Sequence, residues 1–383
     1  NTYDMSVIDV VYDSGGNDTY KYAGPDPFKI KLIIDKSGND HYIGNDIGPA
    51  SGWLGTSILI DHQGNDTYQG KLAANGAGMM GIGLLIDYAG KDIYQGDHFS
   101  NGASLYGAGV ILDLGAEADQ YHSVTFSQGF GGPRGLGLIY DYKGNDLYRA
   151  NGPAPSVYGT PAVYVRFSQG IGFGLRHYDS GGIGIIYDQQ GHDRYEGGEF
   201  SQAGAYYWGL GIIHDEQGND NYYGNRYSQG FGVHQATGIL FDGNGNDNYW
   251  SMTAACQGAA WDVAMGLLID VEGNDTYRGD GLCQGSAAMQ AMAWLIDLDG
   301  VDHYTANSQS AQGHSGNNTY HYDPETPVYS WSVLLDTGGK NDFFSNERNN
   351  NQVVRFSEFN QEQPAESHSY GLFIDTLDRI YPQ

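Results

Sequence analysis

Pairs of aspartates recur along the chain at a spacing that suits cation binding. The first aspartate of a pair ends an apolar run, and the second follows five or six residues later in a block close to Gly-Asn-Asp. Carboxylate oxygens are the ligands that hard cations such as Ca²⁺ prefer. The candidate metal ligands are Asp35 with Asp40, Asp61 with Asp66, Asp87 with Asp92, Asp141 with Asp146, Asp188 with Asp193, Asp215 with Asp220, Asp242 with Asp247, Asp270 with Asp275, and Asp297 with Asp302. The same pattern occurs at Asp13 with Asp18, Asp113 with Asp119, and Asp336 with Asp342.

These pairs create a charge problem if successive copies stack on one another. Equivalent carboxylates one strand spacing apart, about 4.8 Å, repel by roughly 3 kcal/mol per pair at an effective dielectric constant of about 20. One remedy is a hydrogen bond from the turn amides to the first aspartate. The other is a Ca²⁺ ion held between coils by carboxylates and turn carbonyls. The sequence leaves both remedies open.

The aspartates are positioned by a repeat of roughly 27 residues. One unit has an apolar run, the motif Asp-x-x-Gly-Asn-Asp-x-Tyr and a Ser-Gln-Gly turn. The apolar runs are short and rich in β-branched residues, which favours strands, and no stretch shows a sustained helical period. The repeat predicts an all-β parallel β-helix of about 12–13 coils, forming one domain over residues 1–383 with insertions near 149–180 and 314–329. Crossover chirality favours a right-handed path.

Each repeated position should become a column of equal residues along this solenoid. The tyrosine of the motif, from Tyr20 to Tyr304, predicts a stack of packed rings. A glutamine recurs in the Ser-Gln-Gly turn from Gln128 to Gln312, and stacked amides are expected to hydrogen-bond to one another. Cys256 and Cys283 replace the serine of this turn in adjacent coils. We interpret them as small packed residues, with a disulfide between coils as the alternative.

The aspartate turns resemble those of a known calcium-binding family. The block at residues 14–20 reads SGGNDTY, and residues 38–40 and 64–66 both read GND. These blocks resemble the Gly-rich turns of the RTX β-roll family, and that resemblance implies calcium bound between stacked turns. The likeness covers about seven residues per repeat. RTX repeats are nine residues long, their double-glycine signature is mostly missing here, and Lys91, Ala118, His192 and Val301 replace the asparagine.

The charge balance limits the classes of partner. The chain has 46 acidic and 18 basic residues and a net charge of −28, which argues against nucleic acid and against bare polyanions as partners. No apolar run of about 18 residues is present, so no transmembrane segment is expected. A calcium-stabilised solenoid would function outside the cytoplasm, so we expect a secreted, periplasmic or cell-surface protein.

The apolar runs predict a protein partner. The three residues before the first aspartate are nearly all apolar, as at 84–86, 185–187 and 267–269. A strand with one wet face should instead alternate apolar and polar residues. Both faces of this sheet therefore favour burial, which predicts packing against a second copy of the chain or another protein subunit.

Interruptions of the repeat are the places where catalysis is expected. Arg176, His177 and Tyr178 lie in an insertion and could supply a base and a group that neutralises a carboxylate, although residues of this kind are common in ordinary loops. Neighbouring coils and the last insertion add aromatic and polar residues that suit sugar rings. These candidate ligand-binding residues are Tyr206, Tyr207, Trp208, His234, Trp261, Asp262, Tyr320 and His321.

Two functional hypotheses follow. The regular coils favour a calcium-stabilised scaffold or binding module that assembles with itself or another subunit and binds glycans. The alternative is a polysaccharide lyase or glycoside hydrolase with its site near the insertions. The second hypothesis rests partly on analogy, because many right-handed β-helices process polysaccharides.

Overall fold

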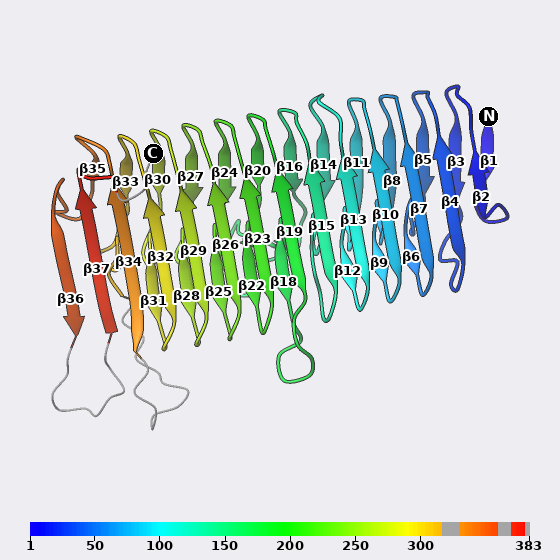
Figure 1. Cartoon of the computed structure of the whole chain (residues 1–383). Helices are drawn as coiled ribbons and strands as arrows, with labels where there is room; N and C mark the ends of the chain where they lie inside the picture. Colours follow the sequence, from blue (N-terminus) through cyan, green and yellow to red (C-terminus); the bar gives the residue numbers. More distant parts are fainter. Residues whose placement is uncertain (316–328, 359–368, 380–383) are drawn as a thin grey trace.

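Successive coils of the chain lie one on another along a single direction (Figure 1). The computed structural model describes residues 1–315, 329–358 and 369–379. Strands of neighbouring coils pair in parallel, and these described residues contain no helix. The prediction of an all-β parallel β-helix is therefore confirmed. Within the same ranges, no helix has the length and apolar character needed to cross a membrane.

Two long sheets run from end to end of the stack, and shorter sheets form a third side. The 13-stranded sheet has the spatial order β1 (Thr2–Asp4), β3 (Thr19–Tyr22), β5 (His41–Gly44), β8 (Thr67–Leu72), β11 (Ile93–His98), β14 (Gln120–Ser123), β16 (Leu147–Ala150), β20 (Arg194–Glu196), β24 (Asn221–Gly224), β27 (Asn248–Ser251), β30 (Thr276–Arg278), β33 (His303–Thr305) and β35 (Phe343–Phe344). The 14-stranded sheet has the order β2 (Val10–Tyr12), β4 (Ile30–Asp35), β7 (Thr56–Asp61), β10 (Ile82–Asp87), β13 (Ala108–Asp113), β15 (Leu136–Asp141), β19 (Ile183–Asp188), β23 (Leu210–Asp215), β26 (Thr237–Asp242), β29 (Met265–Asp270), β32 (Met292–Asp297), β34 (Ser330–Thr337), β37 (Ser369–Thr376) and β36 (Val353–Glu358). The third side contains β6 (Gly52–Trp53), β9 (Gly78–Met79), β12 (Ser104–Leu105), β17 (Val165–Ser168), β18 (Ile171–Phe173), β21 (Glu199–Ser201), β22 (Gly204–Tyr206), β25 (Phe231–Val233), β28 (Ala259–Trp261) and β31 (Ser286–Ala288).

Equivalent strands pair without a shift in register. Asp215 at the end of β23 lies opposite Asp242 at the end of β26, and Tyr222 lies opposite Tyr249. One exception is the pair of β17 and β21, whose register shifts between Val165 and Ser168. The other is β36, which pairs antiparallel with β37 and forms one edge of the 14-stranded sheet. Residues that share a position in the repeat therefore form columns, as predicted.

The interior is filled by the inward residues of both long sheets. On β23, Ile213 and Asp215 point inward and are fully buried, whereas Ile212 and His214 point outward. The motif tyrosines stack in the interior; the rings of Tyr195 and Tyr222, for example, have centroids 4.8 Å apart and planes 4° apart. The predicted tyrosine stack is confirmed, and it spans the coils from Tyr20 to Tyr304 with every one of these rings fully buried.

The glutamine column makes different hydrogen bonds from those predicted. The side-chain amide of Gln229 donates to the backbone carbonyls of Tyr222 (2.9 Å) and Trp250 (3.1 Å), which lie on adjacent strands. Gln202 bonds in the same way to Tyr195 and Tyr223. Both N–H groups of the amide are thus used by strand carbonyls, so neither remains for the next amide in the column. The prediction of amide-to-amide bonding was wrong for these glutamines. It is confirmed for the two asparagines that precede them in the column, because the side-chain amide of Asn75 donates to Oδ1 of Asn101 at 2.8 Å.

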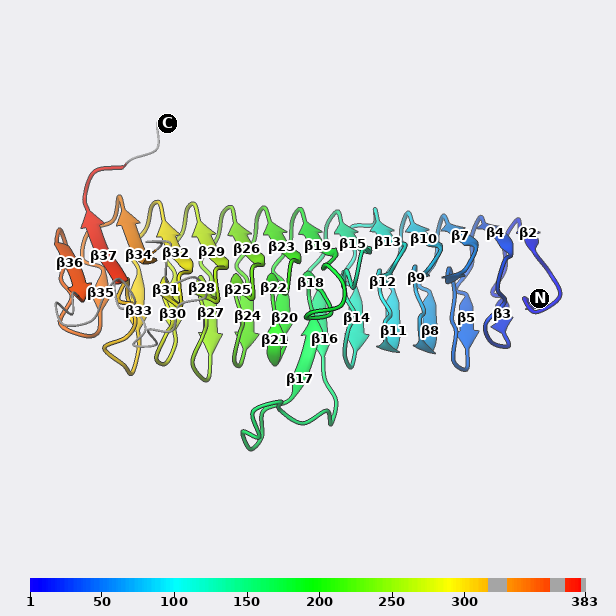
Figure 2. The same cartoon turned by 90° about the horizontal axis from the view of Figure 1, so that it is seen from below.

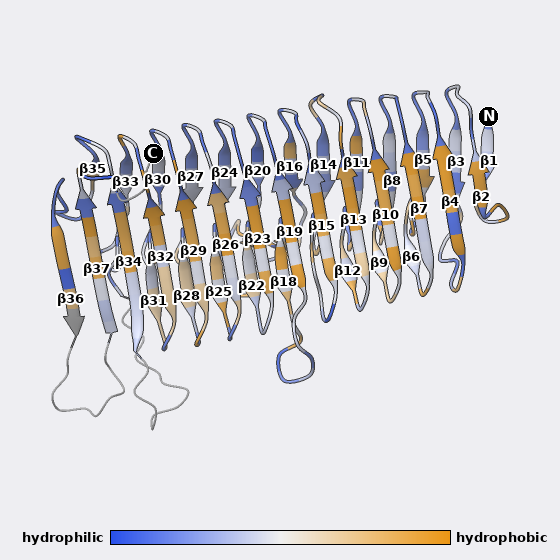
Figure 3. Ribbon diagram, viewed as in Figure 1, coloured by the Kyte–Doolittle hydropathy of each residue, from blue (hydrophilic) through white to orange (hydrophobic). Residues whose placement is uncertain are grey.

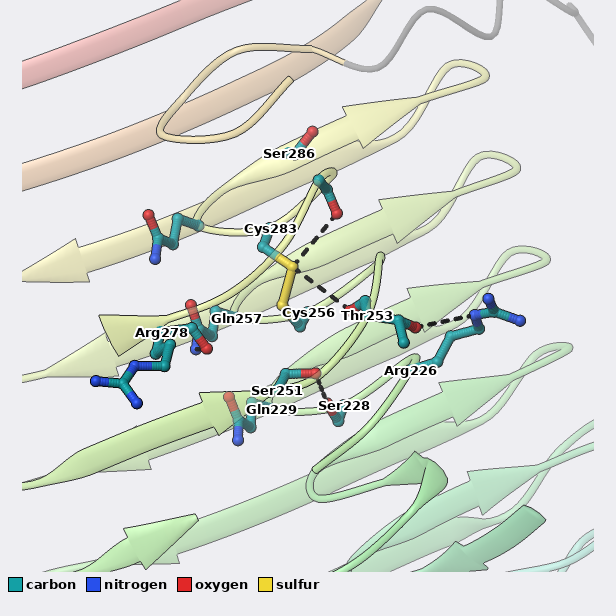
Figure 4. The surroundings of a disulfide bond; sticks show 12 residues. Arg226, Ser228, Gln229, Ser251, Thr253, Cys256, Gln257, Arg278, Cys283 and Ser286 are labelled. Atoms are coloured by element: carbon teal, nitrogen blue, oxygen red, sulfur yellow. Dashed lines mark hydrogen bonds between the residues drawn. A yellow bond between two sulfur atoms is a disulfide. The ribbon is translucent and has the colours of Figure 1, made fainter. Parts of the chain in front are cut away.

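The two cysteines form a disulfide between adjacent coils (Figure 4). Cys256 and Cys283 take the place that Ser228 has one coil earlier, and their Cα atoms are 4.5 Å apart. Our interpretation of two packed thiols was wrong, and the alternative of a disulfide is the one observed. Parallel stacking explains it, because equivalent residues of neighbouring coils lie one strand spacing apart.

Insertions leave the stack in two directions. Residues 151–164 project from the side between β16 and β17 (Figure 2). Residues 174–182 form a second loop between β18 and β19, which hangs from the lower edge in Figure 1. At the foot of the first loop, the fully buried carboxylate of Glu199 accepts hydrogen bonds from Ser156 and Val157. Most of the predicted insertion at 314–329 lies outside the described residues.

Candidate metal centre

The aspartate pairs line the inner corner where the 14-stranded sheet turns into the 13-stranded sheet. The first column comprises the aspartates that end the apolar runs, and the second column those of the Gly-Asn-Asp block. In one coil, Asp215 is the last residue of β23 and Asp220 immediately precedes β24. Both side chains are completely buried. Two parallel columns of carboxyl groups therefore run along the inside of the solenoid.

In most blocks the glycine is required by close packing around these carboxyl groups, although Glu117 stands at this position in the block that ends at Asp119. A Cβ atom on Gly218 would lie 2.2 Å from the carbonyl oxygen of Gly191 in the preceding turn and 2.3 Å from the carboxylate of Asp220. Gly245 meets the carbonyl of Gly218 at 2.1 Å in the same way. Such distances are below van der Waals contact, so only glycine fits at Gly218 and Gly245 without displacing the neighbouring turn.

Tyrosine hydroxyls stabilise the first column. The hydroxyl of Tyr222 donates a hydrogen bond of 2.8 Å to Oδ2 of Asp242 in the next coil. Equivalent bonds join Tyr42 to Asp61, Tyr68 to Asp87, Tyr94 to Asp113, Tyr121 to Asp141, Tyr148 to Asp188, Tyr195 to Asp215, Tyr249 to Asp270, and Tyr277 to Asp297. The turn amides add a second bond in the early coils, as from Gln63 N–H to Asp61 (3.2 Å). The predicted turn capping is thus present, but from Asp141 onward Oδ1 lacks a hydrogen bond of good geometry.

The second column is only half satisfied. The backbone N–H of Asp193 donates to Oδ1 of Asp220 at 2.6 Å, and that of Asp220 donates to Oδ1 of Asp247 at 2.5 Å. The other oxygen, Oδ2, is buried without a hydrogen-bond partner in every member of the column. These bare oxygens belong to Asp18, Asp40, Asp66, Asp92, Asp119, Asp146, Asp193, Asp220, Asp247, Asp275, Asp302 and Asp342.

The two columns meet in groups of three carboxylates. Asp40, Asp61 and Asp66 each place one oxygen so that all three lie within 4.8 Å of one another. Further groups are Asp13 with Asp18 and Asp35, Asp66 with Asp87 and Asp92, Asp92 with Asp113 and Asp119, and Asp119 with Asp141 and Asp146. The part of the chain that the structure describes contains six more. Each of the five named groups joins the two aspartates of one coil to an aspartate of a neighbouring coil.

Four members of these groups were missing from the candidate ligands. Asp13, Asp18, Asp113 and Asp119 lie in the same columns as the predicted residues. The repeat itself was the signal that could have found them, because their positions follow the same spacing. Ala118 stands where most other blocks have asparagine. Asp119 still takes part in a carboxylate group, because the asparagine side chain is not a member of these groups.

Burial and mutual repulsion change the protonation of the groups. Burial, and then the charge of Asp61, raise the pKa of Asp66 to about 9. The same causes, with Asp242 as the neighbour, raise the pKa of Asp220 to about 9. Burial raises the pKa of Asp61 only to about 6, because the hydroxyl of Tyr42 donates to it. At neutral pH Asp66 and Asp220 therefore need a bound proton or a bound cation.

The donors present fit a metal ion. Each group offers carboxylate oxygens, of which the bare Oδ2 atoms are buried and have no other partner. The five groups named above contain aspartate alone, with neither histidine nor cysteine. Such an all-oxygen donor set suits a hard cation and not a thiolate- or imidazole-seeking metal.

Several predicted ligand-binding residues come together at the turns between the third side and the 14-stranded sheet. The imidazole Nδ1 of His234 contacts the carboxylate of Asp262, and its Nε2 lies 3.4 Å from the guanidinium of Arg176. The ring of Tyr206 meets that of His234 edge to face, with centroids 4.9 Å apart. We name Arg176, Tyr206, His234 and Asp262 the histidine cluster.

The other residues that the sequence predicted for catalysis or ligand binding do not form a single cluster. The ring of His177 lies 6.2 Å from that of Tyr207, and Trp261 packs partly buried against the aromatic core of the third side. Tyr178 and Trp208 are exposed. Tyr320 and His321 lie outside the described residues. An open hollow of about 750 Å³ lies elsewhere, over the turns at Gly144, Gly191 and Gly218, and none of the histidine cluster lines it.

Comparison with known proteins adds no relative. No protein-family model, curated protein or solved structure matches this chain. The likeness to RTX turns therefore rests on the residues of the repeat alone.

Proposed function

We propose that the protein is a calcium-stabilised β-helix that serves as a rigid scaffold. The observation that carries this proposal is the row of twelve buried Oδ2 atoms without a hydrogen-bond partner. A buried carboxylate without compensation is strongly destabilising. A cation between coils would compensate the charge of each group and link consecutive coils through the same bonds.

Calcium suits these groups better than other common metal ions. It accepts six to eight oxygen ligands in flexible geometry, which carboxylates and stacked turn carbonyls can supply. Magnesium demands near-ideal octahedral geometry and usually keeps several waters, which a close-packed interior does not offer. The Gly-Asn-Asp turns provide both donor types within a few residues, and this is the feature that they share with RTX turns.

The disulfide supports a location outside the cytoplasm. Disulfides persist in oxidising compartments such as the extracellular space and the bacterial periplasm. Cys256 and Cys283 are both fully buried and joined to each other. We therefore propose that the protein is secreted, periplasmic or attached to the cell surface, where calcium is also plentiful.

Calcium binding would change the effective charge of the scaffold. Of the 46 acidic residues, 25 belong to the two buried columns, Asp375 included, which leaves 21 against 18 basic residues. The strongly negative formal charge is thus largely internal. With the columns neutralised, the outer surface is nearly balanced in charge and is suited to protein partners or uncharged glycans.

The proposal is tested by calcium binding and by thermal unfolding. Protein dialysed against chelator should bind several calcium ions in titration calorimetry, and calcium should raise its melting temperature by several degrees, with magnesium much less effective. Asp275→Asn should reduce the number of bound ions. Glu272→Gln removes one charge from an exposed residue of the same turn and is the matched control. No bound calcium by elemental analysis, together with no calcium effect on melting, would sink the proposal.

A polysaccharide lyase or hydrolase is the second candidate function, and the histidine cluster favours it. A carboxylate at Nδ1 orients an imidazole so that Nε2 can act as a base, and a neighbouring guanidinium can neutralise a sugar carboxylate. Depolymerisation of acidic and neutral polysaccharides should be abolished in His234→Ala and Arg176→Ala if this function holds. Unchanged activity in both variants, or no activity on any substrate, would exclude the cluster as a catalytic site.

A further inference from the structure

The outer face of the 14-stranded sheet carries almost no polar groups. We define the outer face as the three outward residues of each strand from β4 to β37; on β23 these are Leu210, Ile212 and His214. Among the outward residues of these twelve strands, none is Asp, Glu, Lys or Arg, and His214 is the only histidine. Figure 3 shows the result as a band of apolar colour that crosses the sheet. At the last strand, β36, the exposed Arg355 ends this apolar surface.

The fold does not require this outer face to be apolar. The 13-stranded sheet of the same coils has outward residues of opposite character, including Lys21, Arg149, Arg194, Glu196 and Arg278. Both sheets need apolar residues on the inside only. The difference between two outer faces of one solenoid therefore indicates that one is in contact with water and the other with a partner.

The outer face is also flat. The strands of this sheet keep nearly one direction along the whole stack in Figure 1, so the sheet has little twist. Flat sheets of many strands are unusual and are typically stabilised by stacking on another layer.

The size of the face matches a stable protein interface. Twelve strands about 4.8 Å apart extend for about 55 Å, and three outward residues span about 13 Å along a strand. The product, about 700 Å², is close to the roughly 800 Å² per partner that stable complexes bury. It exceeds the roughly 300–600 Å² of the largest apolar patch on a typical monomer.

We propose that this outer face binds the outer face of a second copy of the chain, giving a face-to-face dimer. A second copy offers a surface with the same flatness, length and lack of charge. Two apolar sheets of this kind pack about 10 Å apart in a sandwich. The charged Arg355 at the terminal edge disfavours growth by edge pairing, so the dimer forms through the faces.

Side-chain sizes along the face specify the orientation of the two copies. A twofold axis along the strands, between β19 and β23, makes the solenoids antiparallel. It then places Trp331 on β34 over the small Thr56 on β7, and Met265 on β29 over Ala108 on β13. Large residues of the C-terminal half thereby meet small residues of the N-terminal half. A parallel arrangement would instead place the bulky halves against each other.

The dimer is tested by light scattering and sedimentation of the full chain, with calcium present. The wild type should be dimeric, and Ile212→Lys at the centre of the face should be monomeric with an unchanged circular dichroism spectrum. Ile43→Lys makes the same substitution on the outer face of the 13-stranded sheet and should remain dimeric. A monomeric wild type overturns the proposal, and so does a monomer that binds lipid vesicles through this face. Loss of calcium binding would not overturn the dimer, because dimerisation and calcium binding are measured separately.

The orientation is tested without altering the face. No described cysteine is free, so a single cysteine in an exposed turn can carry a spin label. In the antiparallel dimer, labels on Asn65→Cys of the two copies lie about nine strand spacings apart, on the order of 40–50 Å, whereas labels on Asn219→Cys lie on the order of 10–20 Å apart. Short distances at both positions would overturn the antiparallel orientation, and no measurable distance at either would overturn the dimer.

Discussion

At the scale of single residues, the coils from Tyr20 to Tyr277 are each joined to the next by a tyrosine hydroxyl that donates to a buried carboxylate. The bond from Tyr222 to Asp242 is 2.8 Å long, and both groups are completely buried. The tyrosine therefore has two roles, since its ring stacks on its neighbours while its hydroxyl stabilises a charge. Sequence reasoning predicted the ring stack from the repeat. The hydroxyl bond escaped prediction because it joins residues of different coils.

Tyr222→Phe separates these two roles. The ring stays in the stack, but Oδ2 of Asp242 loses a donor in a buried position, which should lower the free energy of unfolding by about 1–3 kcal/mol. Tyr223→Phe is the control, because Tyr223 points outward on the same strand. Urea unfolding of both variants measures the difference. Equal unfolding midpoints for Tyr222→Phe and the wild type would show that the hydroxyl contributes nothing to stability.

At the scale of strands and turns, the repeat determined most of what was predicted correctly. Equal spacing placed aspartate on aspartate and tyrosine on tyrosine, because parallel coils pair without a shift. The turns of the third side were less predictable. Tyr207 and Trp208, for instance, both have positive φ, at 46° and 58°, although glycine and asparagine are the usual residues there. Stacking of neighbouring turns overrides this local preference, so no local sequence signal marks the conformation.

The disulfide joins two adjacent turns, and its contribution to the free energy of unfolding can be measured. The double variant Cys256→Ser and Cys283→Ser restores the serine that the same turn has at Ser228. Packing should be retained, while the unfolded chain regains the freedom of a 27-residue loop, so stability should fall by about 2–4 kcal/mol. Urea midpoints of the variant and of the reduced wild type should agree. A thiol reagent that labels both cysteines of the native protein would contradict the bond itself.

At the scale of the whole molecule, the most consequential feature is where the charge lies. Composition alone suggested a polyanion and so excluded negatively charged partners. The structure places 25 of the aspartates in the two internal columns, which leaves 21 acidic residues against 18 basic residues in the rest of the chain. Composition cannot locate charge, and only the register of the coils reveals that the carboxylates face each other in groups. The same groups make stability depend on pH in a direction that differs from that of most proteins.

In calcium-free protein, stability should fall as the pH rises. Asp66, Asp220 and Asp302 each have a pKa raised to about 9 by burial and then by a neighbouring carboxylate, whereas an unfolded aspartate titrates near pH 4. Between these two values the folded chain keeps protons that the unfolded chain releases, so each group lowers the free energy of unfolding by up to about 1.4 kcal/mol per pH unit. Melting temperatures in chelator should therefore decrease from pH 5 to pH 9.

Calcium should reverse this trend, because it replaces the protons on the same oxygens. The rise in melting temperature that calcium causes should be small at pH 5, where protons already neutralise the second column, and largest at pH 8–9, where the carboxylates are easiest to ionise. Asp220→Asn removes one titrating group and should flatten the pH dependence in chelator, whereas Glu272→Gln, at an exposed residue of an equivalent turn, should leave it unchanged. A calcium effect of equal size at pH 5 and pH 9 would place the ions elsewhere than in the aspartate columns.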